Sequence, residues 1–498
     1  MGDPLILALD QGTTSTRAIL FAADGRALAE AGSPLEQHYP QDGWVEHDAE
    51  EIFAESVKAL RAVLDKAGRS LSDVAAIGVT NQRETIVLWD RTTGKPVHRA
   101  IVWQDRRTEP ACLALRNAGH EARVTELTGL LLDPYFSGTK LGWLLDHVHG
   151  ARAAAERGEL LAGTIDSWVI WKLTGGRVHA TDATNASRTL LYDIRAGEWS
   201  TEMGEMLGVP LNILPQVRDC TGDFGETEAS ILGRAIRIRG VAGDQQAALM
   251  GQGCIRPGEM KATYGTGCFM LLNTGEAAPI SQARLLTTVA AQVNGRTTYA
   301  LEGAIFIAGA AIQWLGEGLG VQGGPRAAEA LAAGARDDLG VVLVPAFTGL
   351  GAPWWDANAR GGIFGLTRDA GLPEIARAAF DAAALQTRDL IEAMRADAPH
   401  AFKGEVELRM DGGMARSAWF SQRLSDLTGV GVCRATFEET TALGAALFAG
   451  VGAGVYRDVE EAASARPKTE SYRPAMAADP RERAYARWLD AVNRVRAG

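Results

Sequence analysis

Short apolar runs alternate along this chain with longer segments of helical periodicity. Residues 5–9, 74–80 and 85–90 ("LILAL", "VAAIGVT" and "TIVLWD") have the length and side-chain content of buried strands. Residues 49–68 instead repeat apolar positions every three and four residues, which predicts an amphipathic helix. This alternation is typical of an α/β fold with a largely internal sheet.

The second half of the chain repeats the alternation. Residues 341–347 ("VVLVPAF") predict a strand, and residues 373–394 predict a long helix. No Pro/Ser-rich linker or block of charge separates the halves. We therefore expect two domains, residues 1–245 and residues 246–498, that meet in ordered chain near Asp244 with a cleft beside the boundary.

A strand, turn, strand unit occurs in each half. In the first half, residues 5–9 and 17–21 flank a turn of glycine and hydroxyl residues, and "AADGR" (22–26) then predicts a hairpin turn. In the second half, residues 260–264 and 268–272 flank the turn Gly-Thr-Gly. The likeness of the two units suggests that the domains arose by duplication.

Composition narrows the class of protein. A chain of 498 residues exceeds the roughly 250–300 residues at which one core stops growing, and 46% hydrophobic with 22% charged residues is typical of soluble globular proteins. The formal charge of −11 argues against general affinity for nucleic acid or an acidic membrane surface. Any phosphate site must therefore be local.

Three further features indicate the compartment. The five cysteines are odd in number and lack CxxC spacing, so we expect reduced thiols rather than disulfides or a zinc site. The first ten residues, "MGDPLILALD", lack the pattern of a secretion signal, and no stretch is apolar for the roughly 18 residues of a membrane span. These features predict a cytoplasmic protein without membrane insertion.

The first turn has the chemistry of a phosphate cradle. Backbone N–H groups and the hydroxyls of Thr13, Thr14 and Ser15 can face phosphate oxygens in one concavity. Asp10, at the end of the preceding strand, could hold a hydrated Mg²⁺, and Arg17 could approach a transferred phosphoryl group. The alternative is a hairpin whose hydroxyls only satisfy their own turn.

Other nucleotide-binding and hydrolase motifs do not fit the sequence. There is no GxxxxGK[ST], because Gly94-Lys95 is followed by proline, and no GxSxG. Gly318, Gly320 and Gly323 spell GxGxxG, but they follow a helical segment rather than a strand. The sequence therefore predicts neither a P-loop nor a dinucleotide-binding fold.

Two other glycine turns carry candidate chemistry. Asp244 follows a short apolar strand and precedes a helix of small residues, where it could accept the proton of an attacking hydroxyl or simply cap the helix. Gly412 and Gly413 would let the backbone approach a flat adenosine, or could form an ordinary strand-to-helix turn.

Three such turns in this order, in duplicated halves, resemble the actin-like ATPase superfamily, whose two domains share a ribonuclease H-like fold. "YFSGTKLGWLLDH" (135–147) and "GGIFGLTRDAGLPEIARAAFD" (361–381) resemble the two signatures of FGGY carbohydrate kinases. "NQRE", "IVWQDRRT", "GDQQAAL", "TYGTGCFM" and "PAFTGLGAPWWD" are similar to the glycerol-phosphorylating branch of that family. The resemblance implies transfer of phosphate from Mg²⁺-ATP to glycerol, which yields sn-glycerol 3-phosphate.

Position by position, the resemblance implies a set of site residues. Asp244 corresponds to the general base, and the other residues that correspond to polyol contacts are Arg83, Glu84, Trp103, Tyr135, Gln245 and Phe269. The residues that correspond to nucleotide contacts are Thr13, Thr14, Ser15, Arg17, Thr266, Gly309, Gln313, Gly413 and Ser417. Asp10 corresponds to the residue that helps to hold Mg²⁺. Taken singly, Arg83 and Glu84 could equally form an exposed ion pair, and Trp103 could be a core aromatic.

One departure concerns the nucleotide. Ser417 stands where the family commonly has asparagine, so the adenine side of the site differs while the phosphate side does not. Two alternatives remain open: an FGGY kinase for a longer polyol or a ketose, such as erythritol or xylulose, and an actin-like ATPase that assembles or acts as a chaperone. Relatives are often dimers or tetramers, which implies a homo-oligomer.

Overall fold

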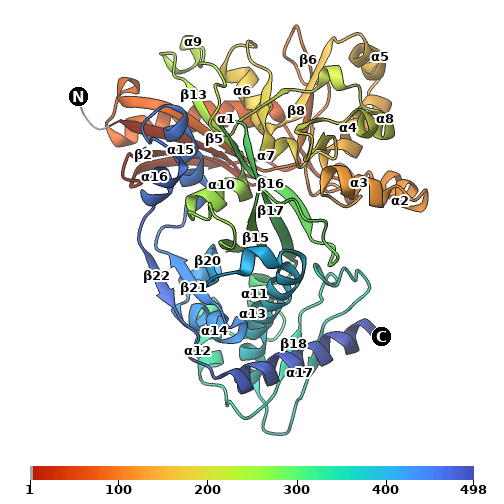
Figure 1. Ribbon diagram of the computed structural model, residues 1–498, viewed down its shortest axis with the longest axis vertical. Coiled ribbons are helices and arrows are strands. Elements are labelled where there is room, and N and C mark those ends of the chain that lie inside the picture. The colour runs from red at the N-terminus through yellow and green to blue at the C-terminus, as the bar shows by residue number, and fades with distance from the viewer. Residues whose placement is uncertain (1–3, 498) are drawn as a thin grey trace.

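The computed structural model describes residues 4–497, in which two α/β halves are stacked along the long axis (Figure 1). The first half holds a five-stranded sheet in the order β13-β5-β1-β2-β3. β2 pairs antiparallel with β1 and β3, whereas β5 runs parallel to β1 and β13. The strands are β1 (Leu5–Gln11), β2 (Ser15–Ala22), β3 (Ala27–Pro34), β5 (Val74–Asn81) and β13 (Ile238–Gly243).

The second half repeats this sheet. Within its seven strands, in the order β16-β17-β15-β14-β20-β21-β22, the run from β17 to β21 has the directions of the run from β3 to β13. The shared order and directions support the duplication that the two similar turns suggested. The strands are β14 (Met260–Tyr264), β15 (Cys268–Gly275), β16 (Leu286–Val293), β17 (Arg296–Ile305), β20 (Glu407–Asp411), β21 (Gly431–Ala435) and β22 (Thr469–Tyr472).

The predicted helices are present with clear ends. α1 (Ala49–Ala67) starts at Asp48, whose side chain accepts from the N–H groups of Glu50 and Glu51, and ends at Gly68 with φ 60°. The long helix α13 (Leu372–Asp397) packs against α12 (Gly324–Ala333) and against α14 (Ala418–Thr428). The last helix, α17 (Ala478–Ala497), packs against α14.

The strand predicted at residues 341–347 is shorter in the structure. β18 covers only Val342–Val344 and pairs with β19 (Gly362–Phe364). Pro345 follows at once and has no N–H to donate to a sheet, so the strand ends there although apolar residues continue.

A smaller sheet extends the first half on the side of the predicted polyol contacts. Its order is β4-β7-β6-β8, and α4 (Ser137–His147) packs against β6. The strands are β4 (Glu46–His47), β6 (Ile86–Asp90), β7 (Ala100–Ile101) and β8 (Leu160–Thr164). This layer holds the loops that carry Trp103 and Tyr135.

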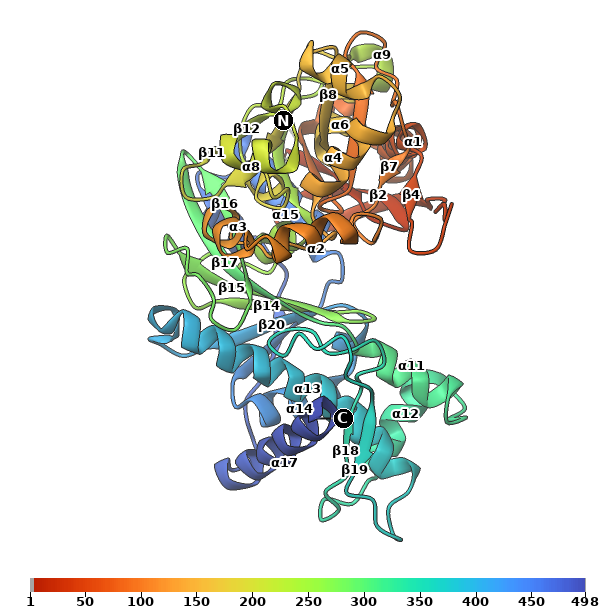
Figure 2. The same cartoon turned by 90° about the vertical axis from the view of Figure 1, so that its right-hand side faces the viewer.

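One helix from late in the sequence belongs in space to the first half. α15 (Thr440–Gly452) packs on β1, β5 and β13 and beside α10 (Asp244–Gly251). Both views of the ribbon show α15 among the elements of the first half (Figures 1 and 2). Glycine makes this approach possible: a Cβ at Gly444 would lie 1.7 Å from the carbonyl oxygen of Ala247. A Cβ at Gly251 would lie 1.9 Å from that of Thr440. The helix that begins with Asp244 is thereby fixed against α15.

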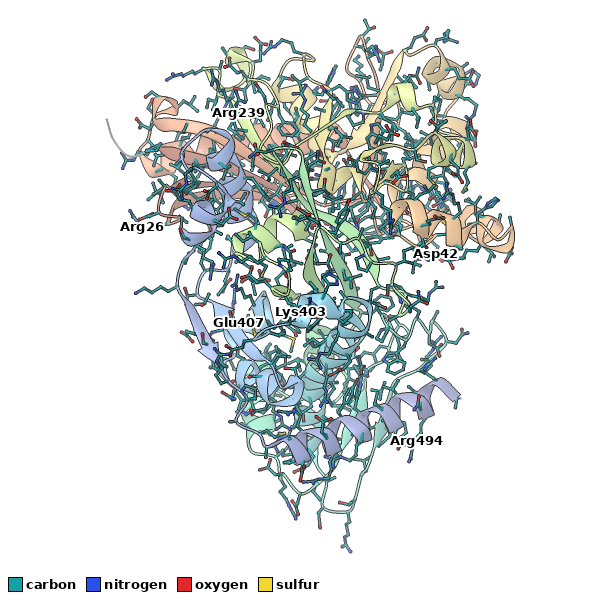
Figure 3. The ribbon with its side chains drawn as sticks, in the orientation of Figure 1. Arg26, Asp42, Arg239, Lys403, Glu407 and Arg494 are labelled. Carbon is teal, nitrogen blue, oxygen red and sulfur yellow. The ribbon has the colours of Figure 1, made fainter. Side chains whose placement is uncertain are left out.

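The surface and the cysteines agree with the composition. Charged side chains of both signs are spread over the outside of both halves, for example Arg26, Asp42 and Arg494 (Figure 3). All five cysteines are buried and free. Among residues 4–497, no helix is both long and apolar enough to span a bilayer.

The contact between α10 and α15 generates the first prediction. We expect Gly444→Ala to lower the free energy of unfolding by about 1–3 kcal/mol, because backbone atoms must move to admit the methyl group. Gly404→Ala is the matched control, since a Cβ there meets nothing within 4 Å, and its effect should stay within about 0.5 kcal/mol. Urea unfolding followed by circular dichroism measures both, and equal midpoints for the two variants would contradict the packing argument.

Candidate active site

The first predicted phosphate turn is a tight hairpin between β1 and β2. The Gly12 N–H donates to the Ser15 carbonyl at 3.0 Å, so the Thr13 and Thr14 side chains stand at the tip of the turn. Trp103 Nε1 donates to Thr13 Oγ1 at 2.9 Å, and the Trp103 and Tyr135 rings meet edge to face at 5.5 Å. The predicted phosphate turn and two predicted polyol contacts are therefore neighbours.

Negative charge gathers at the base of this turn. Asp10, the second-last residue of β1, pairs with Arg17, and burial, with added repulsion from Asp244 and Glu439, raises the pKa of Asp10 to about 7. Arg17 donates to Glu439 at 2.5 Å, so its charge is partly neutralised by a residue of the second half. Repulsion from the two other carboxylates and burial together outweigh the attraction of Arg17 for Asp10, and this local excess of negative charge suits a cation.

A buried network of four charged side chains joins the halves. Glu302, on β17, accepts from Arg83 at 2.7 Å and 3.2 Å through its two oxygens, and from Arg188 at 2.9 Å. Arg188 Nε also donates to Glu84 at 2.7 Å. The side chains are no more than 2% exposed. Arg83 and Glu84 are thus ion-paired but buried, not the exposed pair considered as an alternative.

The network perturbs the ionisation of its carboxylates in opposite directions. Burial by itself would raise the pKa of Glu302, but the guanidinium groups of Arg188 and Arg83 lower it to about 2. Burial raises the pKa of Glu84, and the same two guanidinium groups oppose that rise. Glu84 also has φ 63°, a left-handed conformation that is unfavourable for a side chain with a Cβ. Strain of this kind gathers at functional sites.

Asp244 lies at the edge of this network. It is the first residue of α10, while Gly243 occupies the capping position. One carboxylate oxygen accepts from the Gln245 N–H at 2.7 Å and lies 3.1 Å from Arg83 Nε. The side chain is 32% exposed, so it can reach a ligand while Arg83 orients it. Tyr135 belongs to the same group, because its hydroxyl lies 3.5 Å from Arg83 Nη2.

The second sheet supplies the opposing surface. Phe269 pairs with Thr263 of β14 and Ala304 of β17, two residues along each strand from Lys261 and Glu302 and therefore on the same face of the sheet. Phe269 is half-buried, so part of its ring remains available for contact. Lys261 and Glu302 contact Gln245 and Arg83, so this face of the sheet lies toward the first half.

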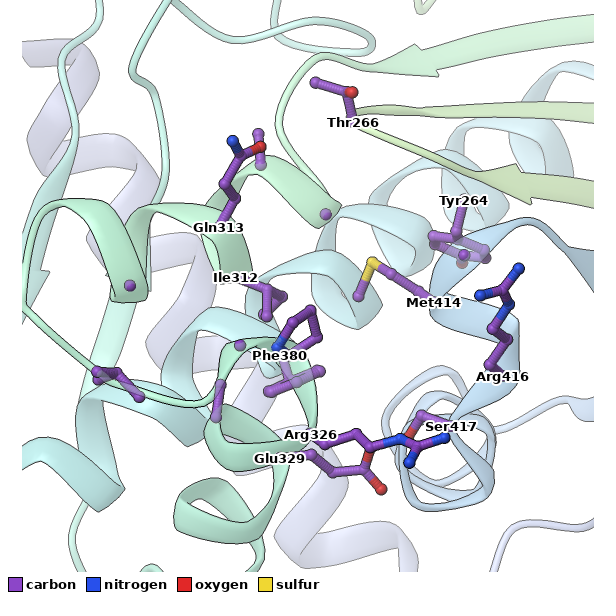
Figure 4. Close-up of a pocket in the computed structure, with 18 of the residues that line it drawn as sticks. Tyr264, Thr266, Ile312, Gln313, Arg326, Glu329, Phe380, Met414, Arg416 and Ser417 are labelled. Carbon is purple, nitrogen blue, oxygen red and sulfur yellow. The ribbon is translucent and has the colours of Figure 1, made fainter.

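The remaining predicted nucleotide contacts line a cavity of about 1030 Å³ in the second half (Figure 4). They are Thr266, Gly309, Gln313, Gly413 and Ser417, whereas Thr13, Thr14, Ser15 and Arg17 lie outside its lining. The cavity walls include Ile312, Val321 and Phe380, apolar surface that suits a planar base. The volume is at the upper end of the roughly 300–1,000 Å³ of ligand pockets.

The backbone around this cavity is held closely. The carbonyl of Thr266 accepts from Ala308 at 2.9 Å and Ala310 at 3.0 Å, which seats the second turn on the start of α11 (Gly309–Glu317). A Cβ at Gly309 would lie 2.4 Å from the Gly265 carbonyl oxygen. Ser417 caps α14, since its hydroxyl accepts from the Phe420 N–H at 2.8 Å. The Ser417 hydroxyl oxygen, which lines the cavity, is thus already engaged in a hydrogen bond to the backbone.

Sequence reasoning missed three charged residues of the site. Arg188, Glu302 and Lys261 are all buried, and none was singled out. A signal existed for two of them: Lys261 and Glu302 interrupt strands that are otherwise mostly apolar or neutral. A charge inside such a strand needs a partner, but the sequence does not say which one.

Family models match most of the chain. The N-terminal domain of the FGGY family of carbohydrate kinases matches residues 5–251, and the C-terminal domain of that family matches residues 260–453. The chain belongs to the FGGY family of carbohydrate kinases. Its two duplicated domains are therefore the two domains of an FGGY kinase, and the buried charged network lies where they meet.

Individual relatives within the FGGY family are similar over almost their whole length. The chain is 53% identical to a glycerol kinase of Ectopseudomonas mendocina, with 99% of each chain covered, and 56% identical to one of Cereibacter sphaeroides, again with 99% of each covered. The crystal structure of Plasmodium falciparum glycerol kinase with ADP superposes with a TM-score of 0.93 at 32% identity, over 99% of this chain and 98% of that one. A xylulose kinase from Rhodospirillum rubrum shares the fold at 24% identity, with a TM-score of 0.88 and 99% of each chain covered.

The buried network generates the second prediction. We expect Glu302→Gln to lower the free energy of unfolding by about 3–5 kcal/mol, because two buried guanidinium groups lose a shared partner. The control is Glu276→Gln, which removes an exposed pair with Arg296 and should cost less than about 1 kcal/mol.

The same variant has a pH signature. Because the pKa of Glu302 lies below its unfolded value of 4.5, its stabilisation is complete above pH 4.5 and is lost as the pH falls toward 2. The stability difference between the wild-type protein and Glu302→Gln should therefore narrow below pH 4.5. A difference that stays constant from pH 7 to pH 3 in urea titrations would contradict the ionised state of Glu302.

Proposed function

We propose that this chain transfers the γ-phosphoryl group of ATP to a primary hydroxyl of glycerol, which yields sn-glycerol 3-phosphate. The observation that carries the proposal is the identity of 53–56% with glycerol kinases over at least 97% of both chains. The geometry supports it, because a partly exposed carboxylate stands beside a polar network at the meeting of the two domains.

On the polyol side, we propose that Asp244 is the general base. The Asp244 carboxylate can accept the hydroxyl proton while Arg83, 3.1 Å from one of its oxygens, holds it in position. Gln245 and Tyr135 offer polar groups to the other hydroxyls, and Trp103 and Phe269 offer apolar surface to the carbon chain. Arg83 and Glu84 form the floor of the site.

On the nucleotide side, we propose that the cavity receives adenosine and that the phosphates extend to the first turn. Thr266, Gly309, Gln313 and Gly413 would contact the nucleotide from the second half, with Ser417 near the base. Thr13, Thr14, Ser15 and Arg17 would meet the terminal phosphates. Only one nitrogen of the Arg17 guanidinium group donates to Glu439, so its other N–H groups can meet a phosphate.

The residues present also suit Mg²⁺. The pKa of Asp10 is raised because its negative charge is buried near two other carboxylates, and a divalent cation would relieve that repulsion. We propose that Asp10 helps to hold the ion, partly through water, since Mg²⁺ dehydrates reluctantly. When bound, Mg²⁺ neutralises charge on the phosphates.

The reaction then depends on position and on the exclusion of water. The attacking hydroxyl lies between Asp244 and the terminal phosphate, its proton passes to the Asp244 carboxylate, and its oxygen forms the new bond in line with the departing ADP oxygen. Closure of the two domains on both substrates would keep water from taking the place of glycerol.

Several further features belong to the proposal. Relatives at 53–56% identity favour glycerol over erythritol or xylulose, whereas the xylulose kinases share only the fold. We propose a cytoplasmic enzyme that forms a homo-oligomer, a dimer or a tetramer. No assembly or chaperone role is needed to explain the site.

The first test measures ADP release with Mg²⁺-ATP and a panel of glycerol, dihydroxyacetone, erythritol, xylulose and ribulose, each beside a blank without polyol. We expect strong glycerol-dependent turnover over a low blank, because the proposed polyol contacts include hydrogen-bond donors and acceptors for three hydroxyls. Preference for a longer polyol would change the proposed substrate from glycerol to that polyol. ATP hydrolysis that is independent of every polyol would overturn the kinase assignment.

A further prediction concerns the proposed base. Asp244→Asn should lower kcat by about 10²–10⁴-fold, because the amide cannot accept the hydroxyl proton, while the KM for ATP changes little. Asp42→Asn, at an exposed site far from the network, should behave as wild type. Steady-state kinetics of both variants with glycerol and ATP decide the matter, and a variant at residue 244 that keeps most of its kcat would remove Asp244 from the mechanism.

A further inference from the structure

A buried lysine reaches the site from the second half and has no role in the mechanism above. Lys261 lies on the central strand β14 with a relative exposure of 0%. Its ammonium group donates to the side-chain oxygen of Gln245 and to Thr263 Oγ1 at 2.9 Å. Because an ammonium group is costly to bury, its acceptors are held firmly in return.

The chemistry of lysine determines which way the Gln245 amide faces. An ammonium group can only donate, so the Gln245 atom that meets it must be the oxygen, and the amide nitrogen then points away. That nitrogen makes no hydrogen bond to any residue between positions 4 and 497. Gln245 is half-buried and adjoins Asp244, so its two N–H donors are available to a ligand.

Lys261 belongs to a pair of charges on one face of the second sheet. In the strand register, Lys261 is opposite Leu271, and Leu271 is opposite Glu302. Glu302 holds Arg83, and Lys261 holds Gln245. The face thus positions two neighbouring side chains of the predicted polyol site, one through an anion and one through a cation.

We infer that Lys261 is a positioning residue that turns the amide nitrogen of Gln245 toward the bound polyol, so that the site requires a hydroxyl oxygen there to accept a hydrogen bond. The inference rests on the proposed function and extends it to specificity. A site with an oriented donor discriminates against a ligand that lacks the matching hydroxyl, because the donor is then left unpaired.

The experiment is a double-mutant cycle with glycerol as substrate. We expect Lys261→Met to raise the KM for glycerol about 10-fold, with kcat and the KM for ATP within about two-fold, since one hydrogen bond to the polyol is lost. Gln245→Leu should raise it by at least as much. In the Gln245→Leu background, Lys261→Met should add less than about two-fold, because Lys261 acts through Gln245.

A third variant tests the orientation directly and does not remove the buried ammonium. Gln245→Glu keeps an oxygen for Lys261 but replaces the N–H donors with an acceptor, so the KM for glycerol should rise about 10-fold or more. Lys58→Met, which alters an exposed pair with Glu55, is the control for loss of a lysine.

The outcomes separate the inference from the proposed function. Wild-type protein without glycerol-dependent turnover would overturn the function itself. Normal glycerol turnover with a KM unchanged in Lys261→Met or in Gln245→Glu would overturn the inference alone. An equal increase from Lys261→Met in both backgrounds would overturn it too, since Lys261 would then act independently of Gln245.

Discussion

The structure depends on four charged side chains that are buried where the two domains meet. Arg83, Glu84 and Arg188 come from the first half, and Glu302 comes from the second. If these charges were buried without their partners, the free energy of their lost hydration would not be offset. The interface is therefore favourable only when the four side chains contact one another. This requirement fixes the second sheet relative to the loop that carries Arg83, and Arg83 in turn orients Asp244.

Close packing of small residues determines the position of the base from the opposite side. α10, which starts with Asp244, is held against α15. α15 lies on the first sheet although it comes late in the sequence, in the second half of the chain. Gly251 and Gly444 allow backbone to touch backbone at this crossing. A second link from α10 to the second sheet runs through Gln252, which donates to Asp411 at 2.9 Å. The helix that carries the proposed base, Asp244, therefore contacts both sheets.

The two proposed substrate regions, the polyol region and the nucleotide region, are built in different ways. The polyol region relies on charged side chains whose partners are fixed by burial. The nucleotide region relies on backbone turns, apolar walls and glycines, which suit a large ligand that brings its own charge. Under the proposed function, this division lets a chain of net charge −11 accept an anion, because attraction is confined to Arg17, the turns and the cation site proposed near Asp10.

The sequence by itself determined the elements and the chemistry that is local in the chain. Apolar periodicity predicted α1 and α13, and short apolar runs predicted the strands β1, β2, β5, β6, β13, β14, β15 and β18. The turns at residues 12–14 and 265–267 were recognised because glycine and hydroxyl residues are adjacent there. Proline at position 345 shortened one predicted strand, which is also a local effect. The assignment of Asp244 to the start of a helix after a strand needed only neighbouring residues.

Only the tertiary structure decided which distant groups meet. Glu302 lies 219 residues from Arg83, and the Lys261 contact to Gln245 joins a strand to a helix of the other half. A charge in a buried strand indicates that a partner is needed, but the identity of that partner depends on how the two sheets and α15 pack. That packing is set by the whole core rather than by the residues on either side of the charge in the sequence. For that physical reason the sequence named the candidate base, while the fold alone revealed the side chains that hold it in place.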